Sequence, residues 1–130
     1  MGSKLYSILF LINFACMSTQ SIYEYADGSA NLYSLNGNTL SYDPVRPEES
    51  STGTYSGGDP KTVQLTSSQA DSIRSLLNKA FNNTADQISD RVKGSGAIRI
   101  SDGKNKKRFI LRQGSEDINR IELALKKCLE

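Results

Sequence analysis

The side chains that most often carry out catalysis are few in this chain of 130 residues. The chain has no histidine, which excludes histidine acid–base catalysis, Ser-His-Asp triads and histidine metal sites. Of its two cysteines, Cys128 falls on the apolar side of a predicted helix, where a packed thiol is more common than a nucleophile. Gly94-Ser95-Gly96 lacks the length and the lysine of a phosphate-binding loop, so we interpret it as a turn.

Carboxylates and hydroxyls remain as candidate chemical groups. Four carboxylates share the segment 43–60, at Asp43, Glu48, Glu49 and Asp59. Their spacing has neither the regular alternation nor the glycine of a calcium-binding loop, so we predict a solvated loop with no metal and no cofactor. We therefore expect a protein that is not an enzyme. A hydrolase that uses carboxylates and hydroxyls alone is the alternative.

Two segments could act by contact, and the first is the long loop at residues 43–60. It holds all three prolines of the chain together with Gly53, Gly57 and Gly58. Loops of this length are commonly functional or simply mobile. Tyr55 is its only aromatic residue and would suit a pocket on a partner. The loop is thus either a partner-binding surface, including the case of an enzyme inhibitor, or a mere connection.

The second segment is a basic hairpin tip at residues 104–108. The tip carries Lys104, Lys106, Lys107 and Arg108, with Arg99 and Arg112 in the flanking strands. No aromatic residue alternates with these charges, so we do not expect nucleic acid as a partner. The functional interpretation is contact with an anionic lipid surface or an acidic partner, and the alternative is a solvated tip.

The charges are unevenly distributed along the chain. Residues 17–90 hold four basic and nine acidic side chains, whereas residues 91–130 hold eleven basic and five acidic ones. Such asymmetry either indicates an acidic partner for the basic half or is neutralised where the two halves meet in the fold.

The first sixteen residues have the layout of an export signal. Lys4 precedes a largely apolar run over residues 5–15, which is about half as long as the ~20 residues of a membrane-spanning helix. The run ends in a small residue followed by a cysteine. This end resembles the lipobox of bacterial lipoproteins, and the matching residues are Ala15 and Cys16, with Leu11 and Ile12 upstream.

The resemblance implies that Cys16 is lipidated and becomes the new N-terminus. The protein would then be anchored in the bacterial cell envelope, in the periplasm or at the outer membrane, rather than fully secreted. Conventional cleavage within residues 16–21 and a leader that is never removed are the alternatives.

The remaining sequence predicts short strands joined by tight turns. Asp27-Gly28 and Asn36-Gly37 separate runs rich in tyrosine and aliphatic residues, which predicts a three-stranded meander over residues 21–42. We expect a short strand near residues 52–55 and another at residues 61–65. Asp102-Gly103 predicts a second hairpin, formed by residues 97–101 and 107–112.

Two amphipathic helices complete the set of elements. Thr66 and Gln69 have capping-box spacing, which predicts a helix that continues to about Asn83. Its apolar face holds Ala70, Ile73, Leu76, Leu77, Ala80 and Phe81. Ser115 begins a closing helix with acidic residues in its first turn and lysines in its last, as the helix dipole favours.

The order β-β-β-loop-β-α-β-β-α predicts an α+β domain in which both helices cover one face of an antiparallel sheet. We assign residues 1–16 to the signal peptide, 17–20 to a tether and 21–130 to this single domain. The sequence thus predicts an exported, lipid-anchored envelope protein that works as a non-catalytic binding module. Its expected partners are the membrane, through the lipid, and another protein.

Overall fold

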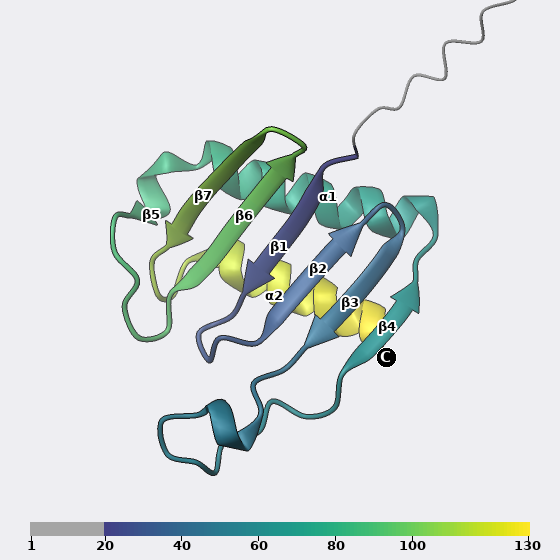
Figure 1. Cartoon of the computed structure of the whole chain (residues 1–130). Helices are drawn as coiled ribbons and strands as arrows, with labels where there is room; N and C mark the ends of the chain where they lie inside the picture. Colours follow the sequence, from purple (N-terminus) through teal and green to yellow (C-terminus); the bar gives the residue numbers. More distant parts are fainter. Residues whose placement is uncertain (1–19) are drawn as a thin grey trace, which may run out of the picture.

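Seven strands form one antiparallel sheet in the computed structural model, which describes residues 20–130 (Figure 1). The strands are β1 (Ile22–Ala26), β2 (Leu32–Asn36), β3 (Thr39–Asp43), β4 (Lys61–Gln64), β5 (Gln87–Ile88), β6 (Gly96–Asp102) and β7 (Asn105–Leu111). Their order across the sheet is β4-β3-β2-β1-β6-β7-β5. The first strand in the sequence therefore lies in the middle, paired with β2 on one side and β6 on the other.

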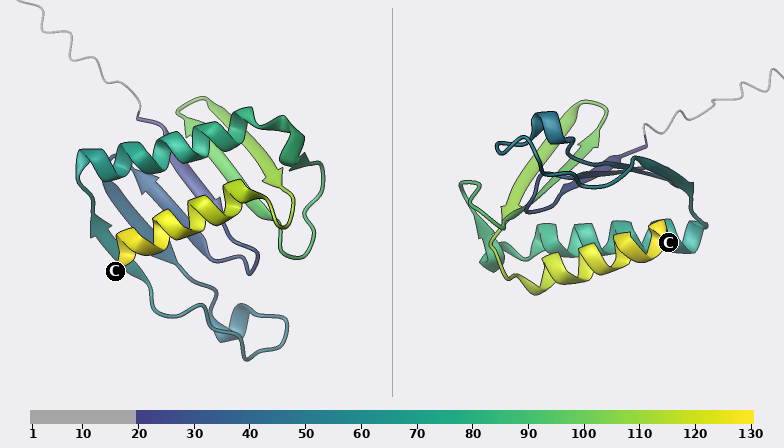
Figure 2. Two further views of the ribbon diagram at one scale, coloured as in Figure 1. Left: turned by 180° about the vertical axis from the view of Figure 1, so that it is seen from behind. Right: turned by 90° about the horizontal axis from the view of Figure 1, so that it is seen from below.

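Two helices, α1 (Ser67–Asn82) and α2 (Glu116–Leu129), cover one face of this sheet (Figure 2). Helix α1 follows β4 at one edge and leads to β5 at the other, so it crosses the whole sheet. Helix α2 returns beside it and ends near β4, where the Lys61 amino group donates a hydrogen bond to the carbonyl of Leu129. Within residues 20–130, no α-helix covers the opposite face of the sheet.

Side-chain hydrogen bonds define where both helices begin. The Thr66 hydroxyl accepts from the backbone N–H of Gln69 at 3.1 Å, and the Gln69 side chain accepts from the backbone N–H of Thr66 at 2.9 Å. This is the predicted capping box, and it satisfies two donors that a helix end would otherwise leave open. The Ser115 hydroxyl caps α2 by accepting from the backbone N–H of Asp117.

The core lies between the sheet and the helices. Alternate residues of the strands point toward the helices, because successive side chains of a strand face opposite sides. The largest fully buried side chains are Tyr25, Leu35, Leu40, Ile98 and Leu111 from the sheet, and Ile73, Leu77, Ile121 and Leu125 from the helices. At the centre the Tyr25 hydroxyl donates to a carboxylate oxygen of Glu122 on α2 at 2.9 Å.

The predicted α+β class, with helices on one face of an antiparallel sheet, is confirmed. The expected strand near residues 52–55 is wrong: the loop instead contains the 3-10 turn η1 (Pro47–Glu49), whose proline fits a first helical position. Strand β5 was not expected, since only two residues pair with β7 after a second 3-10 turn, η2 (Thr84–Asp86).

Both tight hairpins turn one residue later than the sequence suggested. The two-residue loops are residues 37–38 and 103–104, each with positive φ at its glycine, 61° at Gly37 and 69° at Gly103. Positive φ at the first loop residue only is the pattern of a type II′ turn, which needs glycine first. Each loop therefore begins at the glycine and not at the polar residue before it.

Candidate functional site

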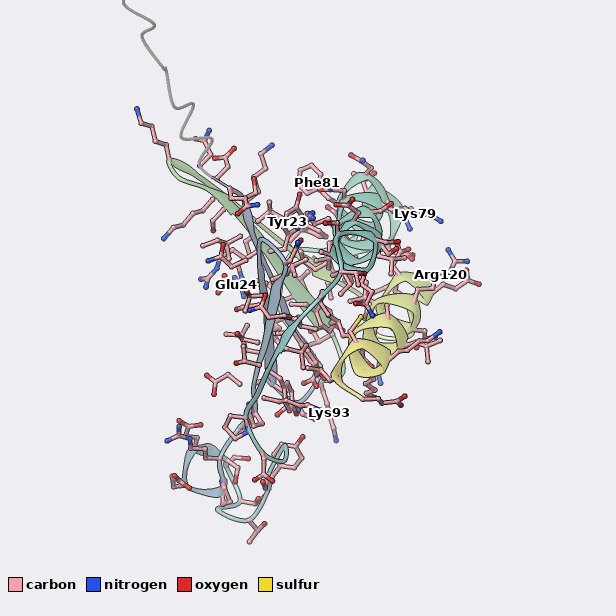
Figure 3. All side chains as sticks on the ribbon, turned by 90° about the vertical axis from the view of Figure 1, so that its right-hand side faces the viewer. Tyr23, Glu24, Lys79, Phe81, Lys93 and Arg120 are labelled. Atoms are coloured by element: carbon pink, nitrogen blue, oxygen red, sulfur yellow. The ribbon has the colours of Figure 1, made fainter. Side chains whose placement is uncertain are left out.

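The helix-free face of the sheet carries the most distinctive group of side chains. Tyr23 and Glu24 are neighbours on β1, and Figure 3 shows Tyr23 toward the helices and Glu24 on the opposite side. The alternation brings three charged residues to this face in one row: Glu24 lies opposite Arg99 of β6, and Arg99 lies opposite Arg108 of β7. Two arginines thus occupy directly facing positions, an arrangement that is normally destabilising in a sheet.

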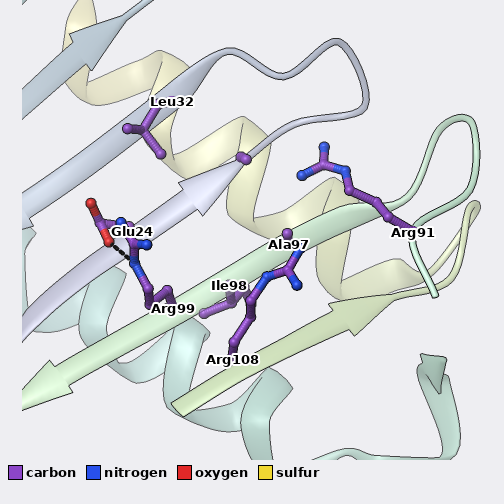
Figure 4. Close-up of a pocket in the computed structure, with 8 residues that line it drawn as sticks. Glu24, Leu32, Arg91, Ala97, Ile98, Arg99 and Arg108 are labelled. Atoms are coloured by element: carbon purple, nitrogen blue, oxygen red, sulfur yellow. Dashed lines mark hydrogen bonds and ion pairs between the residues drawn. The ribbon is translucent and has the colours of Figure 1, made fainter. Parts of the chain in front are cut away.

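These residues line a pocket of about 150 Å³. Its floor is apolar and comes from strands β1, β2 and β6, through Ala26, Leu32 and Ala97. Ile98, whose side chain lies in the core on the other face, also borders the pocket. Its rim holds Glu24, Arg91, Arg99 and Arg108. Figure 4 shows the guanidinium groups of Arg91 and Arg108 on either side of Ala97, while Arg99 is directed toward Glu24.

The three arginines differ in their partners. Arg99 forms an ion pair with the Glu24 carboxylate, and this hydrogen bond raises the pKa of the Arg99 guanidinium above its usual value. Arg91 donates to the backbone carbonyl of Asp27 at 2.6 Å, a contact that fixes its position without neutralising its charge. Among residues 20–130, Arg108 forms no ion pair and no side-chain hydrogen bond. One carboxylate therefore accompanies three guanidinium groups.

The loop at residues 43–60, predicted as a contact surface, is attached to the rest of the domain through Asn31. This residue is 4% exposed and belongs to the turn between β1 and β2. Its side-chain oxygen accepts from the backbone N–H of Val45 at 2.9 Å. Its amide nitrogen donates to the Asp27 carboxylate and to the Tyr55 hydroxyl, both at 3.0 Å.

Tyr55, the predicted anchor, is 40% exposed and lines a shallow groove beside the turn that precedes β2. Its hydroxyl accepts a hydrogen bond from Asn31, while 40% of the residue's surface remains open to solvent. The loop is further fixed by the hydroxyl of Tyr42, which donates to the carbonyl of Gly57 at 2.6 Å. Residues 43–60 thus form a hydrogen-bonded loop with an exposed aromatic ring.

The four predicted basic residues do not share one surface. Lys107 points to the helix side, where its amino group lies 5.2 Å from the centre of the Phe81 ring, a cation–π distance. Arg108 points to the other face and lines the pocket formed with Arg91 and Arg99, called the arginine pocket below. Lys104 and Lys106 remain exposed at the β6–β7 tip.

The β6–β7 tip and the loop at residues 43–60 lie at opposite ends of the sheet (Figure 1). The tip is beside the point where the chain enters β1, because Ile22 pairs with Ser101. The loop is at the end where β1 leaves toward Asn31. The structure therefore does not bring Lys104 and Lys106 together with Tyr55. Cys16, the predicted lipidation site, lies outside the described residues.

Two other polar clusters support the fold. The Asp86 carboxylate accepts from the Ser115 hydroxyl and pairs with Arg112, and both contacts lower the pKa of Asp86. Asn83 at the end of α1 donates to Asp117 in the first turn of α2, which joins the two helix ends. Within residues 20–130, no group of three or more Cys, Asp or Glu side chains is placed to hold a metal ion.

Part of the arginine pocket was visible in the sequence. Given the β6–β7 hairpin, alternation alone places Arg99 and Arg108 on one face, and both residues were noted as basic. Arg91 was missed because it lies in an irregular segment after β5, where no periodicity indicates its direction. Asn31 was missed because its role depends on a loop that begins more than ten residues later.

Comparison of the chain with protein-family models, curated proteins and solved structures found no match. Among residues 20–130, no helix has the length and apolar character needed to cross a membrane.

Proposed function

We propose that this protein is an exported, lipid-anchored binding protein of the bacterial cell envelope, which contacts a protein partner through residues 43–60. The observation that carries the proposal is the arrangement of the two ends of the sheet. The chain enters β1 at one end, and the exposed ring of Tyr55 lies at the other. A domain tethered at its N-terminal side would thus present this loop away from the tether.

The basic tip supports the same orientation. Five residues lie between Cys16 and the start of β1 at Ile22, and these six steps reach at most about 22 Å, so the entry end of the domain would stay close to the membrane. Lys104 and Lys106 lie at that end and are exposed. Basic side chains near an anionic lipid surface each contribute about 1 kcal/mol of attraction. The tip would therefore face lipid, and the loop would face the partner.

The loop has the properties of a prepared contact surface. Its backbone is held by Asn31 and by Tyr42, so binding would order few additional residues. Its aromatic ring is exposed while the hydroxyl is fixed, which limits the loss of side-chain freedom on binding. Aromatic residues of this kind often supply most of the free energy of an interface.

The anchor is tested by labelling with fatty acid in the bacterial host. Wild-type protein should incorporate the label and sediment with membranes, and Cys16→Ser should abolish both. A soluble wild-type protein whose mature N-terminus lies beyond Cys16 would contradict the lipid anchor.

The orientation is tested by photo-crosslinking in intact cells, with the crosslinking residue introduced at position 55, 104 or 68. Position 55 should give adducts with protein, and position 104 should give adducts with lipid. Ser68 is exposed on α1 and serves as the control, with few adducts of either kind. Lipid adducts at position 55, or identical adducts at all three positions, would contradict the proposed contact surface.

A further inference from the structure

We infer that Arg91, Arg99 and Arg108 form a binding site for a phosphate-type dianion on the helix-free face of the sheet. The inference depends on residues 20–130 alone and on neither the lipid anchor nor the contact through residues 43–60. It follows from three observations: the excess of positive charge, the facing pair of arginines, and the shape of the pocket.

The charge around the pocket is unbalanced. Three guanidinium groups line it, and Glu24 supplies the single carboxylate. The nearby Asp27 contributes its backbone carbonyl to Arg91, while its carboxylate accepts from the backbone and side-chain amides of Asn31. The lining residues alone carry an excess of two positive charges, which matches a dianion, and guanidinium groups bind the oxygens of such ions through paired hydrogen bonds.

The facing positions of Arg99 and Arg108 do not stabilise the fold, which favours a role in binding. Arg108 lies directly opposite Arg99, and like charges at this position of an antiparallel pair reduce stability. In the described part of the chain, Arg99 pairs with Glu24 and Arg108 has no carboxylate partner. A bound dianion between the guanidinium groups would replace their repulsion by attraction. Arrangements that reduce the stability of the free protein are common at binding sites.

The size and lining of the pocket limit the ligand. The pocket has a volume of about 150 Å³ and is open to solvent. This space suits a tetrahedral oxyanion with its first attached atoms, and the rest of a larger ligand would extend out of the pocket. The apolar floor of Ala26, Leu32 and Ala97 strengthens the electrostatic attraction, because charges interact more strongly where water is displaced.

The test is a titration of the ¹⁵N-labelled full-length protein with inorganic phosphate, followed by NMR at pH 7.5 and constant ionic strength with chloride as the balancing ion. Amide signals of β1, β6 and β7 around Ala26 and Ala97 should shift and saturate. Arg91→Gln and Arg108→Gln should each weaken binding about tenfold or more, since losing one charge-assisted hydrogen bond costs at least about 1.4 kcal/mol. Arg120→Gln is the matched control, because Arg120 is an exposed arginine on α2, on the other side of the domain (Figure 3).

Two further measurements distinguish a specific site from general attraction. Glu24→Gln should bind phosphate several-fold more tightly, because it removes the carboxylate that competes for Arg99. Acetate should bind at least tenfold more weakly than phosphate. Tighter binding of glycerol 3-phosphate than of phosphate would identify phosphate esters as the ligands, and equal binding would identify the free ion.

The inference is overturned if phosphate causes no saturable shifts in β1, β6 and β7. It is overturned equally if Arg108→Gln and Arg120→Gln weaken binding alike, or if acetate binds as tightly as phosphate. A chemical shift spectrum of each variant that matches the wild type outside the pocket shows that the variant is folded.

Discussion

Replacing Asn31 by alanine should release the loop at residues 43–60 from the domain. Three side-chain hydrogen bonds are lost, with the N–H of Val45, the carboxylate of Asp27 and the hydroxyl of Tyr55. Two neutral bonds contribute about 0.5–1.5 kcal/mol each and the charged one about 1.5–3 kcal/mol. Because Asp27 and Tyr55 can reach water once the loop opens, we expect a loss of about 3 kcal/mol, toward the lower end of that range.

Urea denaturation measures this loss through the extrapolated free energy of unfolding. Hydrogen exchange provides a local measurement. In the wild type the amide of Val45 donates to the Asn31 side chain, and the amide of Gly57 donates to the Val45 carbonyl. Both amides should exchange much faster in the variant. Asn38→Ala is the control, because Asn38 makes one exposed contact of 3.5 Å to Ser67, and it should change stability by less than about 0.5 kcal/mol. A variant at position 31 that is as stable as this control, with unchanged exchange in the loop, would refute the role assigned to Asn31.

Three further predictions concern the fold itself. Leu77→Ala should lower the free energy of unfolding by about 2–5 kcal/mol, whereas Leu76→Ala should lower it clearly less because Leu76 is only half-buried. Equal losses of unfolding free energy in urea denaturation would mean that α1 has a different orientation. Ala30→Gly should stabilise the domain by up to about 1 kcal/mol, since Ala30 has φ 69° and glycine adopts this conformation without strain; a lower Tm would contradict this. Burial raises the pKa of Tyr33 from its usual value of 10.0 to about 12. The free energy of unfolding should therefore be constant below pH 10 and decrease as the pH rises from 10 to 12. A flat profile in urea denaturation over that range would be inconsistent with burial of this hydroxyl.

The elements that the sequence predicted well are those whose signals are local. The capping box at Thr66 and the serine cap at Ser115 depend on residues two or three positions away, and both helices begin where expected. The strands flanking Gly37 and Gly103 follow from alternation and turn chemistry in the same way.

The features that the sequence did not reveal depend on distant partners. Strand β5 exists because Gln87 and Ile88 reach β7, more than twenty residues later, and two residues carry no alternation of their own. Leu76 fits the helical repeat as well as Leu77, but it packs at the margin of the core and is only half-buried. The separation of Tyr55 from Lys104 depends on strand order, which local patterns do not determine.

The central position of β1 has a mechanical consequence. This strand runs from the point where the chain enters the domain to the turn that holds residues 43–60, and it is hydrogen bonded to a neighbour along both sides. The bonds of an antiparallel ladder lie perpendicular to the strands. Residues 43–60 continue directly from β3, so a pulling force between the chain at Gln20 and a partner bound at the loop would enter at β1 and leave through β3. It would load the bonds of the β1–β2 and β2–β3 ladders in shear, all at once instead of one by one. Tension between the tether and the loop would therefore be shared by all the hydrogen bonds of these two ladders.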